Sequence, residues 1–280
     1  NGQFVPALTN GTTVVVTNQS GATVVSGVVN FLVPTVAGNS IDDALFFVQQ
    51  QYLDFFDREA DDKGLDFWKN QITQCGSNDD CLKGQRINTS GAFFMSIEFQ
   101  NTGYMLYRLN KVSFGQRPLR REFLIDMQKL GRGVVVGATG WEVFLEANKR
   151  QFVTDWANSA NFRALYDALT NEQFVDKLAQ NAGVTLTANE RAALADGLRT
   201  GADTRAGVLR KLAENESLKR REFNAAFVLM QYFGYLHRDP DDAGFNYWLK
   251  KLEEFGGDFH TAQMVEAFIT AGEYRGRFNW

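Results

Sequence analysis

Histidine, cysteine and proline, on which much protein chemistry and turn geometry depends, are scarce in this sequence. The 280 residues include two histidines, two cysteines and four prolines. His237 and His260 lie outside any H-E-x-x-H motif, neither has a cysteine partner nearby, and the sequence contains no nucleophile elbow. We therefore predict no catalytic residue, no metal and no cofactor. A hydrolase that uses two carboxylates stays an alternative, because the separation such a pair needs is spatial.

Long apolar runs and blocks of one charge sign are also missing. No stretch reaches the roughly 18 to 20 apolar residues that a membrane-spanning helix needs. The 29 basic and 33 acidic side chains are interspersed and give a formal net charge of -4. This pattern argues against nucleic acid and against an anionic membrane as the main partner. We expect neither nucleic-acid binding nor membrane insertion.

The two cysteines lie close together, at the ends of a short polar segment. Cys75 and Cys81 form a C-x5-C spacing, which differs from the C-x2-C of zinc sites and of thioredoxin-like redox sites. We predict a structural disulfide, with a metal or redox pair as the alternative. A disulfide implies an oxidising compartment. Because the chain opens at Asn1 without a basic, apolar leader, we interpret it as a processed form or a fragment of a secreted protein.

Residues 1–38 differ in composition from the rest of the chain. Residues 12–17 and 22–25 are rich in valine and threonine and flank a turn-forming Asn-Gln-Ser-Gly at 18–21. A third apolar run covers residues 28–33 and ends at Pro34. We predict a β-hairpin or a pair of extended strands here. The side chains assigned to an assembly surface are Val14, Val15, Val16, Val24, Val25, Val28, Val29 and Phe31.

An isolated two-stranded hairpin is only marginally stable in water and needs a surface to pack on. One interpretation is that the segment folds back on its own helical domain or ends a preceding β domain. The other is that it pairs with a strand of another subunit, since exposed strand edges accept further strands.

Residues 39–280 have the pattern of a helical domain. Apolar residues such as Leu45, Val48, Tyr52 and Phe55 recur at spacings of three and four. Their aromatic side chains are more typical of core packing than of a ligand site. The fold class we predict is mainly α, with the short β segment in front of it.

The helical part contains an internal repeat. Residues 47–68 align without gaps on residues 227–248, at an offset of 180. Similar closing elements follow at 92–99 and 267–274. We predict repeat units near 42–103, 104–170, 171–223 and 224–280, of which the middle two are divergent. The second unit is expected to close on Phe162 and the third on Phe223.

Each clear copy has the composition of two helices joined by a capping loop. Aspartates after the first helix are placed to cap the second helix and to complement its dipole, and a tryptophan one turn later is placed to fill the space between helices. The residues assigned to this structural motif are Tyr52, Arg58, Asp61, Gly64, Trp68, Glu98, Phe99, Tyr232, Arg238, Asp241, Gly244, Trp248, Glu273 and Tyr274.

The acidic loops also leave calcium as an alternative to helix capping. An EF-hand loop needs glycine at position 6 and glutamate at position 12. Counting from Asp57 places Gly64 at position 8 and Trp68 at position 12. The spacing therefore favours capping over a calcium site.

These motif residues resemble the bacterial domain of unknown function 4214, a relative of the phycobilisome linker domain. The family pattern reads Phe-Val-x-x-x-Tyr, then Gly-Arg-x-Pro-Asp-x-x-Gly-Leu-x-x-Trp, and closes with Phe-x-x-Ser-x-Glu-Phe. Our sequence departs from it at Asp57, where glycine is usual, and at Ala60, where proline is usual. The resemblance covers roughly residues 42–280. It implies a helical repeat fold without assigned catalytic residues, in an extracellular setting at the C-terminal part of secreted, Calx-beta-type bacterial proteins.

The function we expect is that of a secreted or cell-surface structural protein. Its subunits would join head-to-tail through the β segment into a filament or layer, since heterologous contacts either close into rings or propagate. A second hypothesis is a carbohydrate or surface-ligand binding module, in which exposed aromatic rings stack on glycans. A hydrolase is the third.

Overall fold

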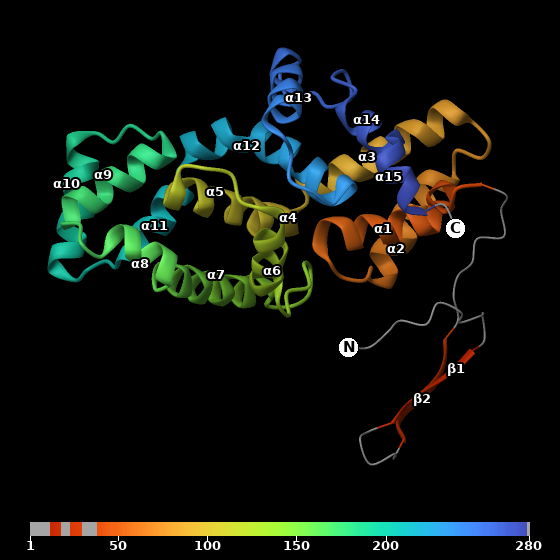
Figure 1. Ribbon diagram of the computed structural model, residues 1–280, viewed down its shortest axis with the longest axis horizontal. Helices are drawn as coiled ribbons and strands as arrows, with labels where there is room; N and C mark the ends of the chain where they lie inside the picture. The colour runs from red at the N-terminus through yellow and green to blue at the C-terminus, as the bar shows by residue number, and fades with distance from the viewer. Residues whose placement is uncertain (1–11, 18–22, 30–37, 279–280) are drawn as a thin grey trace.

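The computed structural model describes residues 12–17, 23–29 and 38–278, and the helical domain forms an elongated body (Figure 1). The predicted mainly α fold is confirmed. The first helices are η1 Ser40–Asp42, α1 Ala44–Phe56, α2 Asp62–Thr73, α3 Asp79–Met95, α4 Ile97–Asn101, α5 Gly103–Phe114, α6 Arg120–Gly131, α7 Trp141–Ala157 and α8 Ala160–Tyr166. The others are α9 Asn171–Ala182, α10 Ala188–Thr200, α11 Arg205–Ala213, α12 Glu216–Gln231, the π-helical turn η2 Tyr232–Leu236, α13 Asp242–Glu254, α14 Met264–Thr270, α15 Gly272–Arg275 and η3 Gly276–Phe278.

Two strands precede the helices. β1 (Thr12–Thr17) and β2 (Thr23–Val29) pair antiparallel as a two-stranded sheet, with an irregularity at Val16 and Thr17. Two extended strands are present in the segment where we predicted a hairpin or a pair of strands, and β2 joins the second apolar run to the start of the third run. The predicted turn at 18–21 and Phe31 lie outside the described residues, as do the side chains of the valines assigned to the assembly surface.

Four connections between helices share one geometry. In each, the helix ends on a residue with positive φ, and the N-cap of the next helix follows four positions later. Glycine adopts this conformation without steric cost, whereas other residues adopt it rarely. The pairs of C-cap and N-cap residues are Asp57 and Asp61, Gly115 and Leu119, Gly183 and Thr187, and His237 and Asp241.

Four later helix starts also share one geometry. Each has an extended N-cap residue, and the side chain three positions on is almost fully buried. The pairs are Ser96 and Phe99, Ser159 and Phe162, Asn215 and Leu218, and Ala271 and Tyr274. In the third predicted unit this helix start falls at Asn215, within the predicted closing segment, and the buried side chain three positions on is Leu218. Leucine there fills the buried space that an aromatic ring fills in the other three, and the predicted unit end at Phe223 stays a prediction.

Equivalent helices of the predicted units pack together in pairs. α1 packs against η2 and α3 against α14, which joins the first unit to the fourth. In the same way α5 packs against α9 and α7 against α11, which joins the second unit to the third. Ion pairs cross both α3–α14 and α7–α11, from Lys83 to Glu266 (2.6 Å) and from Arg210 to Glu146 (2.7 Å). The unit boundaries themselves stay a prediction.

Aromatic side chains dominate the core. Val48, Tyr52 and Phe55 are buried as their spacing predicted. Phe94 of α3 stacks on Phe227 of α12 with ring centroids 4.4 Å apart, which ties the first unit to the last. In the part of the chain that the structure describes, no helix has the length and low polarity needed to cross a membrane.

The two ends of the helical domain meet. Arg275 of α15 forms two hydrogen bonds with the Asp42 carboxylate, at 2.8 and 2.7 Å. The Asn39 side chain donates to the Arg275 carbonyl oxygen (2.8 Å), and Arg86 donates to the carbonyl oxygens of Ile41 and Asp42. The Arg275 hydrogen bonds lower the pKa of Asp42. These contacts among Asn39, Ile41, Asp42, Arg86 and Arg275, which we call the clasp, hold the two ends of the helical domain together (Figure 1).

Candidate functional site

The motif residues of the first copy form one cluster at the connection between α1 and α2. Asp61 caps α2 by accepting a hydrogen bond from the Gly64 N–H (2.9 Å). A Cβ on residue 64 would lie 2.1 Å from the Tyr52 hydroxyl oxygen. Only glycine therefore allows the capping turn to sit directly against this tyrosine. The capping role that we predicted for Asp61 is confirmed.

An arginine joins this loop to the short helix that closes the unit. The Arg58 guanidinium donates from Nε and Nη2 to the two Glu98 oxygens, at 3.1 and 2.7 Å. It also stacks over the Tyr52 ring, with 5.0 Å between its central carbon and the ring centroid. A planar guanidinium suits both contacts, so lysine could not replace it fully. The arrangement fixes the distance between the capping loop and α4.

The last copy repeats these contacts. Asp241 accepts from the Gly244 N–H (2.8 Å), and a Cβ on Gly244 would lie 2.5 Å from the Tyr232 hydroxyl. Arg238 lies over the Tyr232 ring and forms hydrogen bonds of 2.8 and 3.3 Å with Glu273. Backbone hydrogen bonds, chiefly that from Gly244, lower the pKa of Asp241. The sequence alignment therefore identified two clusters with the same contacts.

The tryptophans fill the space between helices, as predicted. Trp68 packs on Phe93, with ring centroids 6.1 Å apart, and Trp248 packs on Phe268 at 5.5 Å. Phe99 and Tyr274, which close the two copies, are almost completely buried. The assigned motif residues thus lie in two structural clusters, and their hydrogen bonds and ring contacts account for them as packing elements.

Three acidic side chains of the two loops contact α6 or the segment before it. Asp57 accepts a hydrogen bond from the Gln128 amide, Asp239 from the Arg120 backbone N–H (2.8 Å), and Asp242 pairs with Arg117. Across residues 12–17, 23–29 and 38–278, no group of three acidic, histidine or cysteine side chains is arranged to hold a metal ion. The described contacts of these loops are those of a packing interface.

A buried carboxylate that the sequence did not reveal connects the first copy to the last. Asp54 of α1 accepts from the Gln50 amide (2.7 Å), lies 3.0 Å from His237 Nε2, and pairs with Arg277 at 2.7 Å. Its partners are separated from it by up to 223 residues. The available signal was an acidic residue within the apolar stripe of α1, a position that is costly unless it is paired. His237 therefore has a structural partner.

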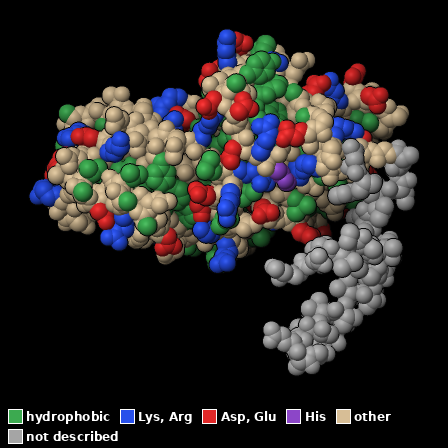
Figure 2. Space-filling view, viewed as in Figure 1, with side chains coloured by type: hydrophobic (Ala, Val, Ile, Leu, Met, Phe, Trp, Pro, Cys, Tyr) green, Lys and Arg blue, Asp and Glu red, His purple; other side chains and the backbone are tan. Residues whose placement is uncertain are grey.

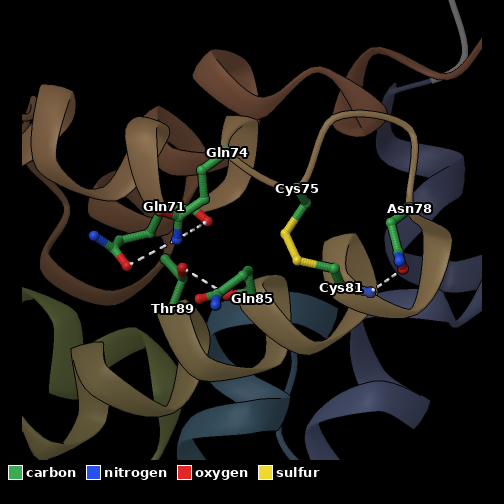
Figure 3. Close-up of a disulfide and its surroundings, with 7 residues drawn as sticks. All are labelled: Gln71, Gln74, Cys75, Asn78, Cys81, Gln85 and Thr89. Carbon is green, nitrogen blue, oxygen red and sulfur yellow. Dashed lines mark hydrogen bonds between the residues drawn. A yellow bond between two sulfur atoms is a disulfide. The ribbon is translucent and has the colours of Figure 1, made fainter.

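The two cysteines form a disulfide between α2 and α3 (Figure 3). Their Cα atoms are 5.5 Å apart. Asn78, within the small ring, caps α3 by accepting from the Cys81 N–H (3.0 Å). The predicted pairing is present, and it fixes a connection that belongs to the first copy alone.

The tyrosines do not form an exposed surface for stacking on sugars. Seven of the eight are buried, and Tyr247 is 58% exposed. Phe67, at the equivalent position of the first copy, is also exposed, and each ring packs edge-on against the following tryptophan. The exposed aromatic rings among the described residues also include Phe144 and Phe255, so the hypothesis of glycan stacking depends on these four rings.

Residues 211–278 match the model of a protein family described as Domain of unknown function (DUF4214). The matched segment contains the last copy of the motif, from Tyr232 to Tyr274. The resemblance indicated by the motif residues is thereby confirmed for this part of the chain. No curated protein and no solved structure matches the sequence.

Proposed function

We propose that this protein is a non-catalytic structural module of an extracellular or cell-surface assembly, in which copies join through the β1–β2 segment. The observation that carries the proposal is the two-stranded sheet of β1 and β2. Each strand of such a sheet has one edge outside the pair, and a two-stranded sheet is marginal alone in water. A strand from a neighbouring copy completes the sheet.

The motif clusters support a structural role for the helices. Arg58 and Arg238 are both committed to carboxylates within the domain, at Glu98 and Glu273. The capping aspartates, glycines and tryptophans are engaged in the same contacts. The helical domain then supplies a rigid body, and the β segment supplies the link between bodies. The small disulfide supports an oxidising, extracellular setting.

The test uses the full chain with a proline placed in β1. Successive residues in a strand direct their N–H groups to opposite sides. Of Val14→Pro and Val15→Pro, one therefore removes a hydrogen bond within the hairpin and the other removes a donor from its outer edge. Val14→Thr and Val15→Thr keep the N–H and the β-branched shape and are the controls. Mass distribution is measured by sedimentation velocity and by electron microscopy of the native material.

We expect the unmodified chain and the threonine variants to form the same rings or polymers, and the proline variants to shift towards monomer. A chain that is monomeric throughout contradicts the proposal, as do proline variants that assemble like the unmodified chain. If the proline variants are monomeric like the unmodified chain but lose thermal stability, the hairpin packs on its own helical domain instead.

A further inference from the structure

A cleft of about 570 Å³ lies among α4, α5, α7 and α12. Its volume falls in the range of small-molecule sites, roughly 300 to 1,000 Å³. Its lining comes from residues other than those of the two motif clusters. The packing roles described above therefore do not account for the charged groups that gather in it.

Arg108 of α5 is a buried cation in the wall of this cleft. Its side chain lies against the Tyr104 ring, 4.1 Å from the centroid, and Nε donates to the Ala213 carbonyl oxygen (2.7 Å). The residue is only 4% exposed, and Nη1 has no hydrogen-bond partner among the described residues. A ring face and a carbonyl oxygen carry no full negative charge. Glu214 and Glu216 raise the pKa of Arg108 from a distance, but among the described residues no carboxylate forms an ion pair with it.

Lys149 of α7 is a second buried cation in the same wall. It is 9% exposed, and its Nζ donates to the Asn101 side-chain oxygen (2.7 Å). Within the described ranges, neither Lys149 nor Arg108 has a carboxylate oxygen within 4.0 Å. Burial lowers the pKa of both groups, whereas hydrogen bonds with Glu146 raise the pKa of the nearby Arg210. The pKa shifts therefore have opposite directions in Arg108 and Lys149, which have no ion-pair partner in the described part of the chain, and in Arg210, which has one.

The mouth of the cleft adds further positive charge. Lys219 and Arg220 of α12 line it, and Glu214 is the acidic residue of the lining. The Glu214 carboxylate already pairs with Arg210 (3.1 Å). Over the face shown in Figure 2, basic and acidic side chains are interspersed. The cleft departs from that balance, because its four basic residues outnumber the one acidic residue.

We propose that this cleft binds a small hydroxylated organic anion, a carboxylate or a phosphate ester, with its anionic group between Arg108 and Lys149. An unpaired buried charge is costly, and a bound anion supplies the missing counter-charge. The guanidinium offers planar donors that suit carboxylate and phosphate. Amide side chains of Gln100 and Asn224 line the remaining space and suit hydroxyl groups. The site is independent of the assembly role proposed above.

Calorimetric titration of the full chain tests this site with four probes. Glucuronate and glucose 6-phosphate carry the two anionic groups, while glucose lacks the charge and inorganic phosphate lacks the hydroxylated ring. We expect one or both sugar anions to bind, with affinity falling as salt increases. Glucose should not bind, and inorganic phosphate should bind more weakly than the sugar anion. Absence of binding by both sugar anions, binding of glucose, or phosphate binding at least as tight as that of the sugar anion overturns the proposal.

Four variants separate binding from a purely structural role. Arg108→Met should weaken binding about tenfold or more, since a charge-assisted hydrogen bond is lost. Arg220→Ala changes an exposed side chain and should weaken binding a few-fold without loss of folding, and Glu214→Gln should strengthen it because a negative charge leaves the lining. Arg163→Ala, an exposed arginine of α8 outside the cleft, is the matched control.

If Arg108→Met fails to fold, the charge dependence seen with Arg220→Ala and Glu214→Gln decides the question. Affinities unchanged in both variants overturn the site. Opposite shifts in the two variants, with no shift for Arg163→Ala, support it.

Discussion

The first and last copies of the motif end their second helix on the same turn but secure that turn by different chemistry. Gly76 and Gly256 both have positive φ, at an offset of 180. Asn78 and Asp258 then occupy equivalent positions and accept hydrogen bonds from the backbone N–H three residues on, at 3.0 and 3.2 Å. Both copies therefore share the backbone geometry of the turn, although the side chains that hold the turn differ.

The difference lies in the side chains that hold the two ends of the turn. The first copy uses the disulfide between Cys75 and Cys81. In the last copy the Thr261 hydroxyl, at the position equivalent to Cys81, donates to Asp258 at 2.6 Å. One copy therefore has a covalent ring and the other a reinforced helix cap. Each copy can therefore be altered separately. Three sets of substitutions test how the units are stabilised.

The largest effect is expected at the glycines that face the tyrosine hydroxyls. Gly64→Ala and Gly244→Ala force the capping turn away from Tyr52 and Tyr232, and we expect each to cost about 1 to 3 kcal/mol of unfolding free energy. Gly64 should be the more sensitive, because its Cβ would come within 2.1 Å of oxygen, against 2.5 Å for Gly244.

Gly84→Ala within α3 is the matched control. Nothing lies within 4 Å of a Cβ at this position, so alanine should stabilise the helix by roughly 0.5 to 1 kcal/mol. The measurement is urea unfolding followed by circular dichroism. Equal responses at the three glycines would remove the steric explanation.

The next effect concerns the disulfide. Replacing both Cys75 and Cys81 by serine releases the small loop, and chain entropy predicts a loss of about 2 kcal/mol. Thr261→Val removes the equivalent hydrogen bond from the last copy, and we expect a loss of about 1 kcal/mol. Thermal unfolding of both variants gives the ranking. A larger loss for Thr261→Val would mean that the cap, rather than the covalent ring, holds the turn.

The smallest effect concerns acid stability in the middle units. Hydrogen bonds from Arg210 lower the pKa of Glu146 from 4.5 to about 2. A lowered folded-state pKa means that Glu146 contributes stability above pH 4.5, and this contribution is lost as the pH falls from about 4.5 to about 2. Glu146 is partly exposed, so the contribution should stay below about 1 kcal/mol.

Glu146→Gln should therefore flatten the pH dependence of the unfolding free energy between pH 4.5 and pH 2. Asp167→Asn, which removes the exposed partner of Arg163, gives the comparison for an ion pair within one helix. An unchanged slope in the Glu146 variant would show that the bridge between α7 and α11 does not couple to folding.

The repeated motif could be predicted from the sequence because its side chains are specified locally. A capping aspartate, a glycine three residues on and a tryptophan one turn later lie within one loop and one helix. The same logic reached Phe162, because Ser159 caps the helix start there. It also reached Asn215, which caps the start of α12, but it did not single out Leu218, since burial at this position requires apolar volume and not an aromatic ring.

Contacts between distant segments could not be predicted in this way. Asp54 meets Arg277, and Arg108 and Lys149 meet in one cleft, only because helices far apart in sequence pack together. Periodicity places a residue on a helix face but does not specify which other helix covers that face. The length of β2 was missed for a local reason, because Ser26 and Gly27 interrupt the β-branched pattern while the strand continues through them.

The clasp between Asp42 and Arg275 determines how the helical domain responds to force. A chain that passes through this domain enters and leaves it at neighbouring points, so the domain adds bulk beside the path of the chain and little length along it. Tension between the two ends acts on the Asp54–Arg277 pair, on the Asp42–Arg275 pair and on the bonds that Arg86 makes to the same segment. The disulfide between α2 and α3 lies away from these contacts and is loaded only after they have opened.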